Sequence, residues 1–461
     1  MSKVTDEQQC QRYSAARMAR DYRFDGAFFV AVKSTGIFCR PICPAPLPME
    51  KNVDYYTVAS QALDAGFRPC LRCRPDSAPG SPAWQGADTT LSRGLSLLAE
   101  NHEQSIPDIA ARLGISQRYL HKLVSENLGL SPQKYRRYNQ ALFAKQLLQQ
   151  TMLPVTDIAL ASGLNSARRL QSLCQQILDK TPSQLRAQHA SETPESISLF
   201  LSYRPPYDWE AIREFLKRRL IHNTEAIDEQ SFAKVFTYGK GIGRFKATHV
   251  AQKHGFAVEV QVSDLTILRP VIANIKRLLD LSADPMIIAE SLIKTGLAQT
   301  YINPGMRQPG VWNEFEAGVR AILGQQVSVT AAINLLNKVV AEYGESTPYG
   351  TAFPLPENIA TASLECISMP GARKEALRNF AALYCEYDCP QDAQILAIKG
   401  IGQWTLDYIS LRGRSWPDVY LGGDLIVKKM QSRTPITPQN GAPWRSYLTL
   451  QLWALSDRIK E

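Results

Sequence analysis

Two close pairs of cysteines lie within the first eighty residues of the chain. Cys39 and Cys43 form the first pair, and Cys70 and Cys73 form the second. Two such pairs are typical of a tetrahedral zinc site made of four thiolates. Because bound zinc keeps its sulfur ligands deprotonated, a zinc-bound thiolate is also a nucleophile. The spacing therefore predicts that these cysteines bind Zn²⁺ and that the site can do chemistry as well as hold the fold.

Arginines stand beside these thiols, as Arg40, Arg68, Arg72 and Arg74. A structural zinc knuckle needs only the four sulfur atoms, so the basic neighbours favour a site that meets phosphate. A purely structural zinc knuckle remains the alternative interpretation.

A second candidate for chemistry lies in residues 396–424. Gly400 and Gly402 form a Gly-Ile-Gly turn, which is typical of a helix-hairpin-helix. Glycines let the backbone come close to a ligand, so the amides at the start of the next helix can face a DNA phosphate. Asp424 follows two further glycines and is a candidate catalytic carboxylate, although a helix cap would suit the same sequence. Trp404 and Tyr408 lie between, where packing in a core is the alternative role.

An internal repeat separates these two candidates. Residues 106–120 and 155–169 each place Asp-Ile-Ala before a turn at Gly114 or Gly163, followed by a Ser or Asn that can open a second helix. This is the spacing of a helix-turn-helix motif, given twice. The basic second helices predict DNA contacts through Arg118, Lys122, Arg168 and Arg169.

The net charge of +9 is unevenly distributed. Residues 1–80 hold 11 Lys and Arg against 8 Asp and Glu, and residues 81–190 hold 12 against 7. The excess predicts an anionic partner for the first 190 residues. The sequence has no apolar run long enough to cross a membrane and no apolar signal core at its start. Nine cysteines without a secretion signal favour metal binding over disulfides, which predicts a reducing cytoplasm.

At 461 residues the chain is expected to form several domains, mainly α-helical. Residues 77–83 and 190–195 have the composition of linkers. Alternating stretches at 197–203 and 257–262 predict antiparallel strands, and helical periodicity returns from about Pro285. We therefore predict a small α/β zinc domain, an all-α tandem helix-turn-helix, and an α+β part with an antiparallel-sheet lobe and helical lobes. The expected boundaries of these four parts are 1–80, 85–190, 196–285 and 286–461.

The zinc segment resembles the N-terminal domain of the Ada methylation-response regulators, over residues 25–43 and 65–75. The resemblance implies that Cys39 irreversibly accepts a methyl group from a DNA methylphosphotriester while the other three cysteines remain ligands. The repeat resembles the DNA-binding domain of AraC-type regulators and shares the ending at 181–186. Leu170 and Cys174 stand where that family usually carries Phe. These resemblances imply transcription regulation at promoter sites, with RNA polymerase as a further candidate partner.

The C-terminal half resembles the AlkA-type alkylbase DNA glycosylases, from residues 204–209 through 318–328 to the helix-hairpin-helix. The resemblance implies that alkylated bases such as 3-methyladenine are flipped out of double-stranded DNA and released by cleavage of the N-glycosidic bond. Asp424 falls on the catalytic position. The positions lining the base pocket hold Trp404, Tyr408, Trp453 and Phe215. Their electron-rich rings suit a cationic base.

Several positions depart from that family pattern. Gln326 stands where a Leu wedge fills the gap left by the flipped base, and Leu425 and Ala454 replace pocket tyrosines. Trp404 occupies the place of a Schiff-base Lys, which predicts a monofunctional glycosylase that does not nick the strand. We interpret Cys385 and Cys389 as ordinary helix cysteines.

The leading hypothesis is a fused adaptive-response protein that combines a methyl-accepting zinc domain, a DNA-binding regulator and a DNA-3-methyladenine glycosylase II. One rival is a transcription regulator whose glycosylase lobe only grips DNA. A second rival is a repair enzyme whose front half recruits it to damage.

Overall fold

The chain folds into two compact units, Met1–His189 and Ala190–Glu461, in a computed structural model. The structure describes residues 3–20, 24, 28–43, 45–57, 61–62, 65–70, 73, 75, 89–100, 104–113, 115–186 and 196–458. Both predicted linkers, Gly114, Arg72 and Arg74 lie outside the described residues. The finer division into four parts stays a prediction. Within the described residues no helix is both long and apolar enough to cross a membrane.

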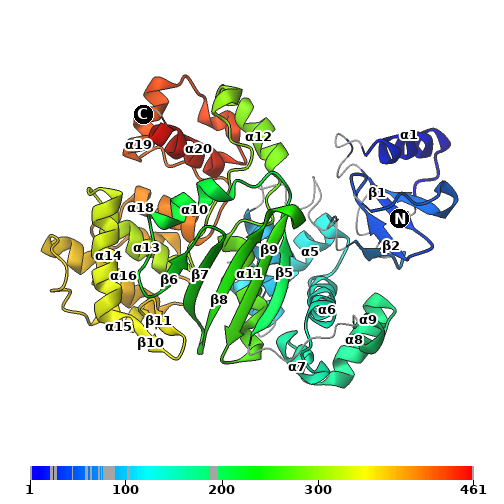
Figure 1. Cartoon of the computed structure of the whole chain (residues 1–461), viewed down its shortest axis with the longest axis horizontal. Coiled ribbons are helices and arrows are strands. Elements are labelled where there is room, and N and C mark those ends of the chain that lie inside the picture. Colours follow the sequence, from blue (N-terminus) through cyan, green and yellow to red (C-terminus); the bar gives the residue numbers. More distant parts are fainter. Residues whose placement is uncertain are drawn as a thin grey trace. The chain divides into compact units, whose positions relative to one another are not determined.

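The first unit begins with a small sheet whose strand order is β3-β1-β2-β4 (Figure 1). Its elements are α1 (Glu7–Met18), β1 (Phe29–Val32), β2 (Ile37–Cys39), β3 (Val53–Tyr56) and β4 (Arg68–Pro69). Strands β1, β2 and β3 pair antiparallel, whereas β2 and β4 pair in parallel. This register brings the end of β2, at Cys39, beside Cys70, which follows β4. The predicted α/β zinc domain is confirmed.

The rest of the first unit is helical where the structure describes it. Its helices are α3 (Thr89–Glu100), α4 (Ile106–Arg112), α5 (Gln117–Leu128), α6 (Pro132–Gln150), α7 (Val155–Ala161), α8 (Ala167–Leu178) and α9 (Pro182–Leu185). The predicted repeat forms two helix pairs, α4 with α5 and α7 with α8. Ser116 and Ser166 cap the second helix of each pair, and Gly163 takes the left-handed conformation with φ 72°.

The second unit contains an antiparallel sheet with strand order β5-β9-β8-β7-β6. Its strands are β5 (Ile197–Ser202), β6 (Glu225–Ile227), β7 (Ser231–Tyr238), β8 (Gly241–Val250) and β9 (Gly255–Val262). The two strands predicted from alternation are β5 and β9, and they pair directly. Trp312 stacks on Phe236 and Phe245 and so packs this sheet against the helices that follow.

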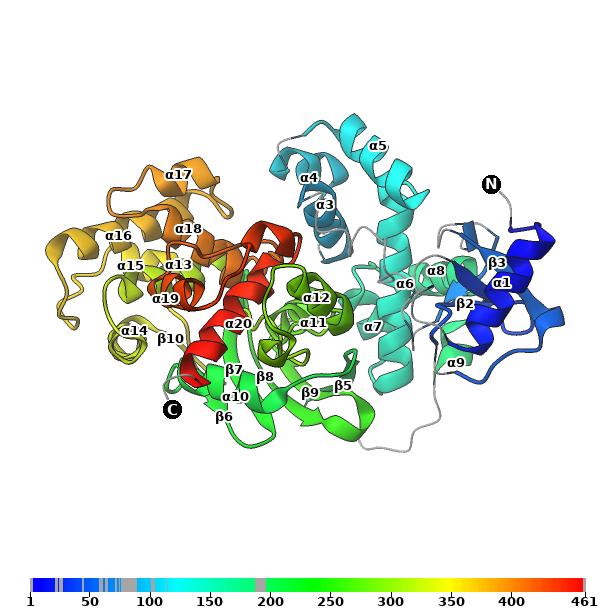
Figure 2. The ribbon, with the colours of Figure 1, turned by 90° about the horizontal axis from the view of Figure 1, so that it is seen from above.

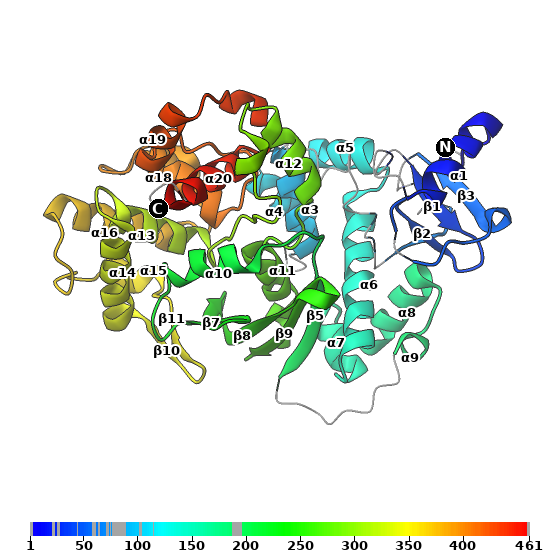
Figure 3. The same cartoon turned by 45° about the horizontal axis from the view of Figure 1, so that its top comes forward.

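The helices of the second unit are α10 (Trp209–Lys217), α11 (Leu268–Leu278), α12 (Pro285–Ile293), α13 (Glu314–Gly324), α14 (Val329–Tyr343), α15 (Pro356–Ala360), α16 (Gly371–Glu386), α17 (Asp392–Leu396), α18 (Gln403–Tyr408), α19 (Leu425–Arg433) and α20 (Arg445–Arg458). Figures 1 and 2 show α13 to α16 and α18 gathered at one end of this unit, and Figure 3 shows α11 alongside the sheet. The expected helical return after Pro285 is confirmed, apart from the short hairpin of β10 (Glu345–Thr347) and β11 (Gly350–Ala352). Strand β11 begins directly after the turn, at Gly350, whose φ of 123° is one that side chains disfavour.

Four buried charged side chains join the sheet to α13. Lys234 contacts Glu225 at 2.7 Å and Glu316 at 3.1 Å, and Arg320 contacts Glu316 at 2.8 Å and Glu225 at 3.3 Å. Burial alone would raise the pKa of Glu316, but Lys234 and Arg320 lower it below its ordinary value. Two cations and two anions alternate in this network, so each buried charge has a partner of opposite sign.

Candidate functional site

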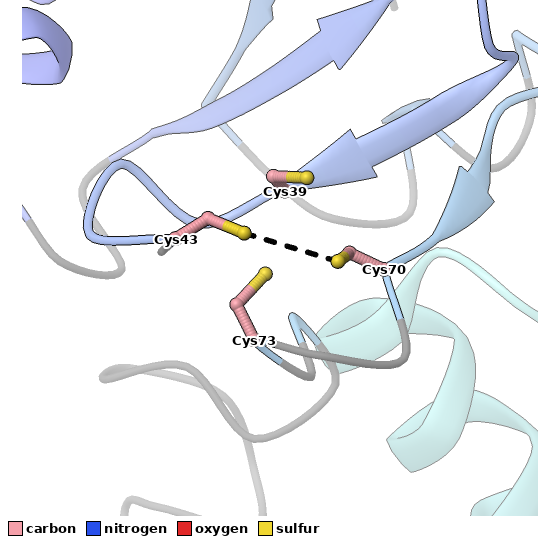
Figure 4. A group of neighbouring side chains, drawn as sticks. All are labelled: Cys39, Cys43, Cys70 and Cys73. Carbon is pink, nitrogen blue, oxygen red and sulfur yellow. Dashed lines mark hydrogen bonds between the residues drawn. The ribbon is translucent and has the colours of Figure 1, made fainter. Parts of the chain in front are cut away.

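The four cysteines of the first unit converge on one point (Figure 4). Their sulfur atoms all lie within 4.8 Å of one another, and Cys43 Sγ and Cys70 Sγ are 3.9 Å apart. Tetrahedral zinc with Zn–S bonds of about 2.3 Å would hold its sulfurs roughly 3.8 Å apart. The donor set and its spacing therefore fit Zn²⁺.

Burial distinguishes the four thiols. Cys43 and Cys73 are buried, whereas Cys39 and Cys70 are partly exposed. The predicted methyl acceptor, Cys39, is thus one of the two that a substrate can reach. Cys39 also ends strand β2, so its backbone is held by the sheet.

Of the arginines beside the thiols, Arg40 is buried. Its side chain is 2% exposed, its backbone N–H donates to Cys73 Sγ at 3.3 Å, and its Nη1 donates to the Cys73 carbonyl at 3.4 Å. Arg40 therefore contacts both the sulfur and the backbone carbonyl of Cys73. Arg68 is nearer the surface and donates through Nη2 to the Thr35 carbonyl at 3.0 Å.

The predicted DNA-contacting side chains of the repeat all point into solvent. Arg118 and Lys122 lie on α5, Arg168 and Arg169 lie on α8, and all four are exposed. The opposite face of α8 holds Leu170 and Cys174, which are completely buried. Burial raises the pKa of the Cys174 thiol to about 11, so this cysteine acts as a small apolar core residue. Leu170 and Cys174, which stand where the family usually carries Phe, therefore both pack in the core.

In the second unit Asp424 is held by three hydrogen bonds to one of its oxygens. Oδ1 accepts from the backbone amides of Ile426 at 3.0 Å and Val427 at 3.2 Å, and from the Trp453 indole Nε1 at 3.1 Å. Asp424 thus caps α19, as the alternative interpretation expected, and is also tied to α20. No hydrogen bond from the described residues reaches Oδ2. The arrangement leaves that oxygen available to a substrate.

The predicted pocket residues come together in one group, which Trp453 joins to Asp424. Trp404, Tyr408 and Trp453 pack against one apolar cluster, and the rings of Trp404 and Tyr408 lie 5.6 Å apart. Phe215, from α10, stacks with Trp453 at 6.3 Å with 18° between the ring planes. Three helices distant in sequence, α10, α18 and α20, therefore supply neighbouring rings.

Sequence reasoning missed two guanidinium groups in this region. Arg219 lies 3.8 Å from the centroid of the Phe215 ring, and Arg412 lies 4.7 Å from it. Arg412 is 1% exposed and donates to the Pro309 carbonyl at 2.7 Å, and burial lowers its pKa. Arg412 also lies 6.0 Å from the centroid of the Tyr408 ring and donates to the Tyr408 hydroxyl at 3.4 Å. Phe215 and Tyr408 thus already contact cations of the protein, which leaves Trp404 and Trp453 as the rings for a cationic base. No local sequence signal marks Arg412, because its partners are distant in the chain.

The helix-hairpin-helix turn and the wedge position are neighbours. Gly400 has φ 95°, and Gly402 is the residue that precedes α18. Gln325 donates through Nε2 to the Gly400 carbonyl at 3.0 Å. Gln326 is exposed with φ 59°, and its Oε1 accepts from Arg373 Nη2 at 3.4 Å. The structure therefore places the glycine turn next to the segment of Gln325 and Gln326. Gln326 itself has a backbone conformation that favours glycine.

Cys385 and Cys389 differ from the expected pair of helix cysteines. Cys385 is exposed near the end of α16, which ends at Glu386, so Cys389 lies beyond the helix. Its sulfur lies 3.9 Å from Glu314 Oε1. In the described part of the chain, the only cluster of three or more metal-ligating side chains is the one at Cys39.

Helix α20, which carries Trp453, is anchored at two points. Tyr447 donates to Asp280 Oδ2 at 2.9 Å, and Gln451 exchanges two hydrogen bonds with the backbone of Asn303, at 2.8 and 3.1 Å. These anchors lie within two turns of Trp453. They hold the indole that reaches Asp424.

Comparison with known proteins agrees with this geometry. Residues 12–76 match the metal-binding domain of Ada, residues 109–188 match a helix-turn-helix domain, and residues 198–313 match the AlkA N-terminal domain. A probable bifunctional transcriptional activator/DNA repair enzyme AlkA of Mycobacterium tuberculosis is 32% identical, over 97% of this chain and 96% of that protein. The chain belongs to this AlkA family of bifunctional activator and repair proteins.

Two further relatives each match one part of this AlkA-family chain. DNA-3-methyladenine glycosylase 2 of Escherichia coli is 33% identical, over 55% of this chain and 95% of that protein. The bifunctional transcriptional activator/DNA repair enzyme Ada of Escherichia coli is 32% identical, over 40% of this chain and 49% of that protein. The chain thus combines an Ada-type zinc domain with a DNA glycosylase, and Zn²⁺ is the cofactor that its four-cysteine cluster suits.

The Asp280 anchor makes the stability of the second unit depend on pH. Burial raises the pKa of Asp280 to about 6, although Arg307 and hydrogen bonds from Gln308 and Tyr447 oppose the rise. The folded state therefore holds this proton more tightly than the unfolded state. The stabilisation of the folded state by protonated Asp280 is complete below about pH 4, and it is lost as pH rises through about 6.

We predict that Asp280→Asn, which keeps the acceptor but cannot ionise, gains stability relative to wild type as pH rises. The gain between pH 4 and pH 7 should approach about 3 kcal/mol in the free energy of unfolding. Urea unfolding followed by tryptophan fluorescence measures it, because six of the seven tryptophans lie after residue 190. A difference between variant and wild type that does not change with pH would contradict this assignment.

Proposed function

We propose that the second unit is a monofunctional DNA glycosylase that releases alkylated bases such as 3-methyladenine. The observation that carries the proposal is the Asp424 carboxylate, which is fixed through Oδ1 by α19 and by Trp453, a ring that packs on the same apolar cluster as Trp404. The E. coli glycosylase relative, which this chain covers over 95% of its length, supports the same reaction.

The residues around Asp424 suit a cationic transition state. Cleavage breaks the bond between the sugar C1′ and the base nitrogen, and the bonding electrons leave with the base. Asp424 stabilises the positive charge that develops on the sugar, because its carboxylate is negative and already oriented. Trp404 and Trp453 hold a cationic alkylated base by its faces, each contact being worth roughly 0.5–2 kcal/mol. The cationic base leaves as the neutral base, and water then adds to C1′ and loses a proton to solvent.

No side-chain amine stands at position 404 to attack the sugar. Trp404 occupies the place of the Schiff-base Lys of lyase-competent relatives, so the proposed product is an intact strand with an abasic site. The rival of a non-catalytic lobe that only grips DNA is not favoured, because such a lobe would not need an oriented carboxylate in an aromatic pocket.

We further propose that the zinc domain is a suicidal methyl acceptor that controls transcription. Cys39, Cys43, Cys70 and Cys73 would hold Zn²⁺, which would keep their thiolates deprotonated. Cys39, partly exposed at the end of β2, attacks the methyl carbon of a DNA methylphosphotriester. A sulfur–carbon bond forms, the carbon–oxygen bond breaks, and an ordinary phosphodiester anion leaves. The four-thiolate centre changes from a formal charge of −2 to −1, which lowers its repulsion of DNA. The exposed basic residues of α5 and α8 then bind promoter DNA, where RNA polymerase is the proposed partner.

Asp424→Asn tests the glycosylase proposal. The amide keeps the cap of α19 but loses the negative charge, so base release should fall by about 10²–10³ while DNA binding is retained. Release of 3-methyladenine from alkylated DNA measures it, with Asp388→Asn, an exposed carboxylate of the same unit, as the matched control. Equal rates for wild type and Asp424→Asn would refute the catalytic role.

Methyl transfer has its own test. After incubation with DNA that carries methylphosphotriesters, peptide mass analysis should find one methyl group on Cys39, with zinc still bound. Cys39→Ala should lose the transfer but keep base release, because the two sites lie in separate units. Exposed Cys385, which is not part of the four-cysteine cluster, should stay unmodified. A methyl group on Cys70 in place of Cys39 would contradict the proposal.

A further inference from the structure

Arg412 is a fully buried cation, and no carboxylate of the described residues forms an ion pair with it. Its Nε donates to the Pro309 carbonyl at 2.7 Å, and its Nη1 donates to the Tyr408 hydroxyl at 3.4 Å. Both acceptors are neutral, and a guanidinium keeps its proton in proteins. The side chain is therefore held by hydrogen bonds, while its charge has no direct counter-charge.

The charges around Arg412 do not cancel its own. The alternating network between the sheet and α13 sums to zero, because each of its two carboxylates contacts both of its cations. Arg412 lines one cavity with Arg219, Arg320 and Glu225. Burial lowers the pKa of Arg412, and repulsion by Arg320 contributes to the lowering. Arg219 is partly exposed, so water screens its charge. Arg412 thus adds one unscreened positive charge to a balanced region.

The backbone that carries Arg412 has a rare local structure. Ile409–Gly413 continues α18 as a π-helix. A single π turn beside an α-helix is uncommon and occurs frequently at functional sites. Here it holds the guanidinium 4.7 Å from the centroid of the Phe215 ring and 6.0 Å from that of Tyr408. The segment therefore places the cation against two of the predicted pocket rings.

Arg412 and Asp424 lie at opposite ends of a chain of contacts through the proposed base pocket. Asp424 accepts a hydrogen bond from the Trp453 indole, which stacks on Phe215. The Phe215 ring in turn contacts the Arg412 guanidinium. In the proposed function Asp424 faces the sugar and these rings face the base. The positive charge of Arg412 therefore lies on the side of the base, and the negative charge of Asp424 lies on the side of the sugar.

We propose that Arg412 speeds base release by opposing the positive charge of the bound alkylated base. When the bond between C1′ and the base nitrogen breaks, its electron pair stays with the base and neutralises it, and the positive charge moves to the sugar beside Asp424. Arg412 repels this charge more strongly on the base than on the sugar. Its repulsion is thus partly relieved in the transition state, which lowers the barrier. The inference rests on the proposed glycosylase function and adds to it a charge that acts through the pocket rings.

Arg412→Gln in the full chain tests this charge, with duplex DNA that contains 7-methylguanine, a cationic base, as the probe. Single-turnover kinetics with excess protein give the maximal rate of base release and the protein concentration that gives half of it. The variant should lower the maximal rate about tenfold and should also lower the half-saturating concentration about tenfold, because it removes a repulsion that is strongest in the bound ground state. Arg412→Lys, which keeps the charge, should leave both quantities close to those of wild type.

Arg414→Gln is the matched control for the loss of a buried arginine. Arg414 is also largely buried, but Glu314 and Asp392 neutralise it at 2.9 and 2.7 Å. Its variant should lower stability without lowering the half-saturating concentration. Arg412→Met is measured beside Arg412→Gln, since an apolar side chain suits a buried position if the amide does not fold there.

Slower release with an unchanged or higher half-saturating concentration in the uncharged variants would overturn the proposal and leave Arg412 a structural role only. An equal loss in Arg412→Lys would overturn it as well. A wild-type protein that releases no base would refute the glycosylase proposal itself, so the two failures are distinguishable.

Discussion

Three hydrogen bonds to one carboxylate oxygen set the geometry of the base-release site. Two come from the backbone at the start of α19, and the third comes from the Trp453 indole on α20. A carboxylate with one oxygen held in this way cannot rotate freely, so its other oxygen keeps a defined direction. The proposed catalytic step needs this orientation, because charge stabilisation depends on groups that are placed before the reaction begins. The proposed function therefore depends on how four helices are placed relative to one another, α10, α18, α19 and α20.

The remainder of the second unit serves to hold those helices. The Asp280–Tyr447 contact and the Gln451–Asn303 pair fix α20 in the two turns that precede Trp453. The alternating charge network between the sheet and α13 fixes the other side of the core. Breaking one member of such a network leaves a buried charge without its partner, which typically costs 3–5 kcal/mol. Rigidity near the pocket thus comes from polar contacts between distant segments as well as from apolar packing.

Sequence patterns predicted the parts whose determinants are local. The four cysteines converge as their spacing predicted, and both helix-turn-helix repeats form with their serine caps. Sequence patterns did not predict contacts between residues that are far apart in the chain. The Arg412 guanidinium on Phe215 and the Asp280 anchor involve segments that no periodicity connects. Gly318, noticed only as part of a motif, is required because a Cβ there would lie 2.0 Å from the Phe380 ring. The burial of Arg40 was not predictable for a similar reason, since it depends on contacts with Cys73.

The central claim, that the Trp453 indole orients Asp424, is tested most directly by Trp453→Phe. Phenylalanine keeps a ring to stack on Phe215 and a base but removes the N–H donor. A hydrogen bond to a charged group is worth about 1.5–3 kcal/mol, so the single-turnover rate of base release should fall about tenfold to a hundredfold. The DNA concentration that gives half the maximal rate should stay the same. An unchanged rate with weaker binding would show that Trp453 is only a wall of the pocket and would contradict this account.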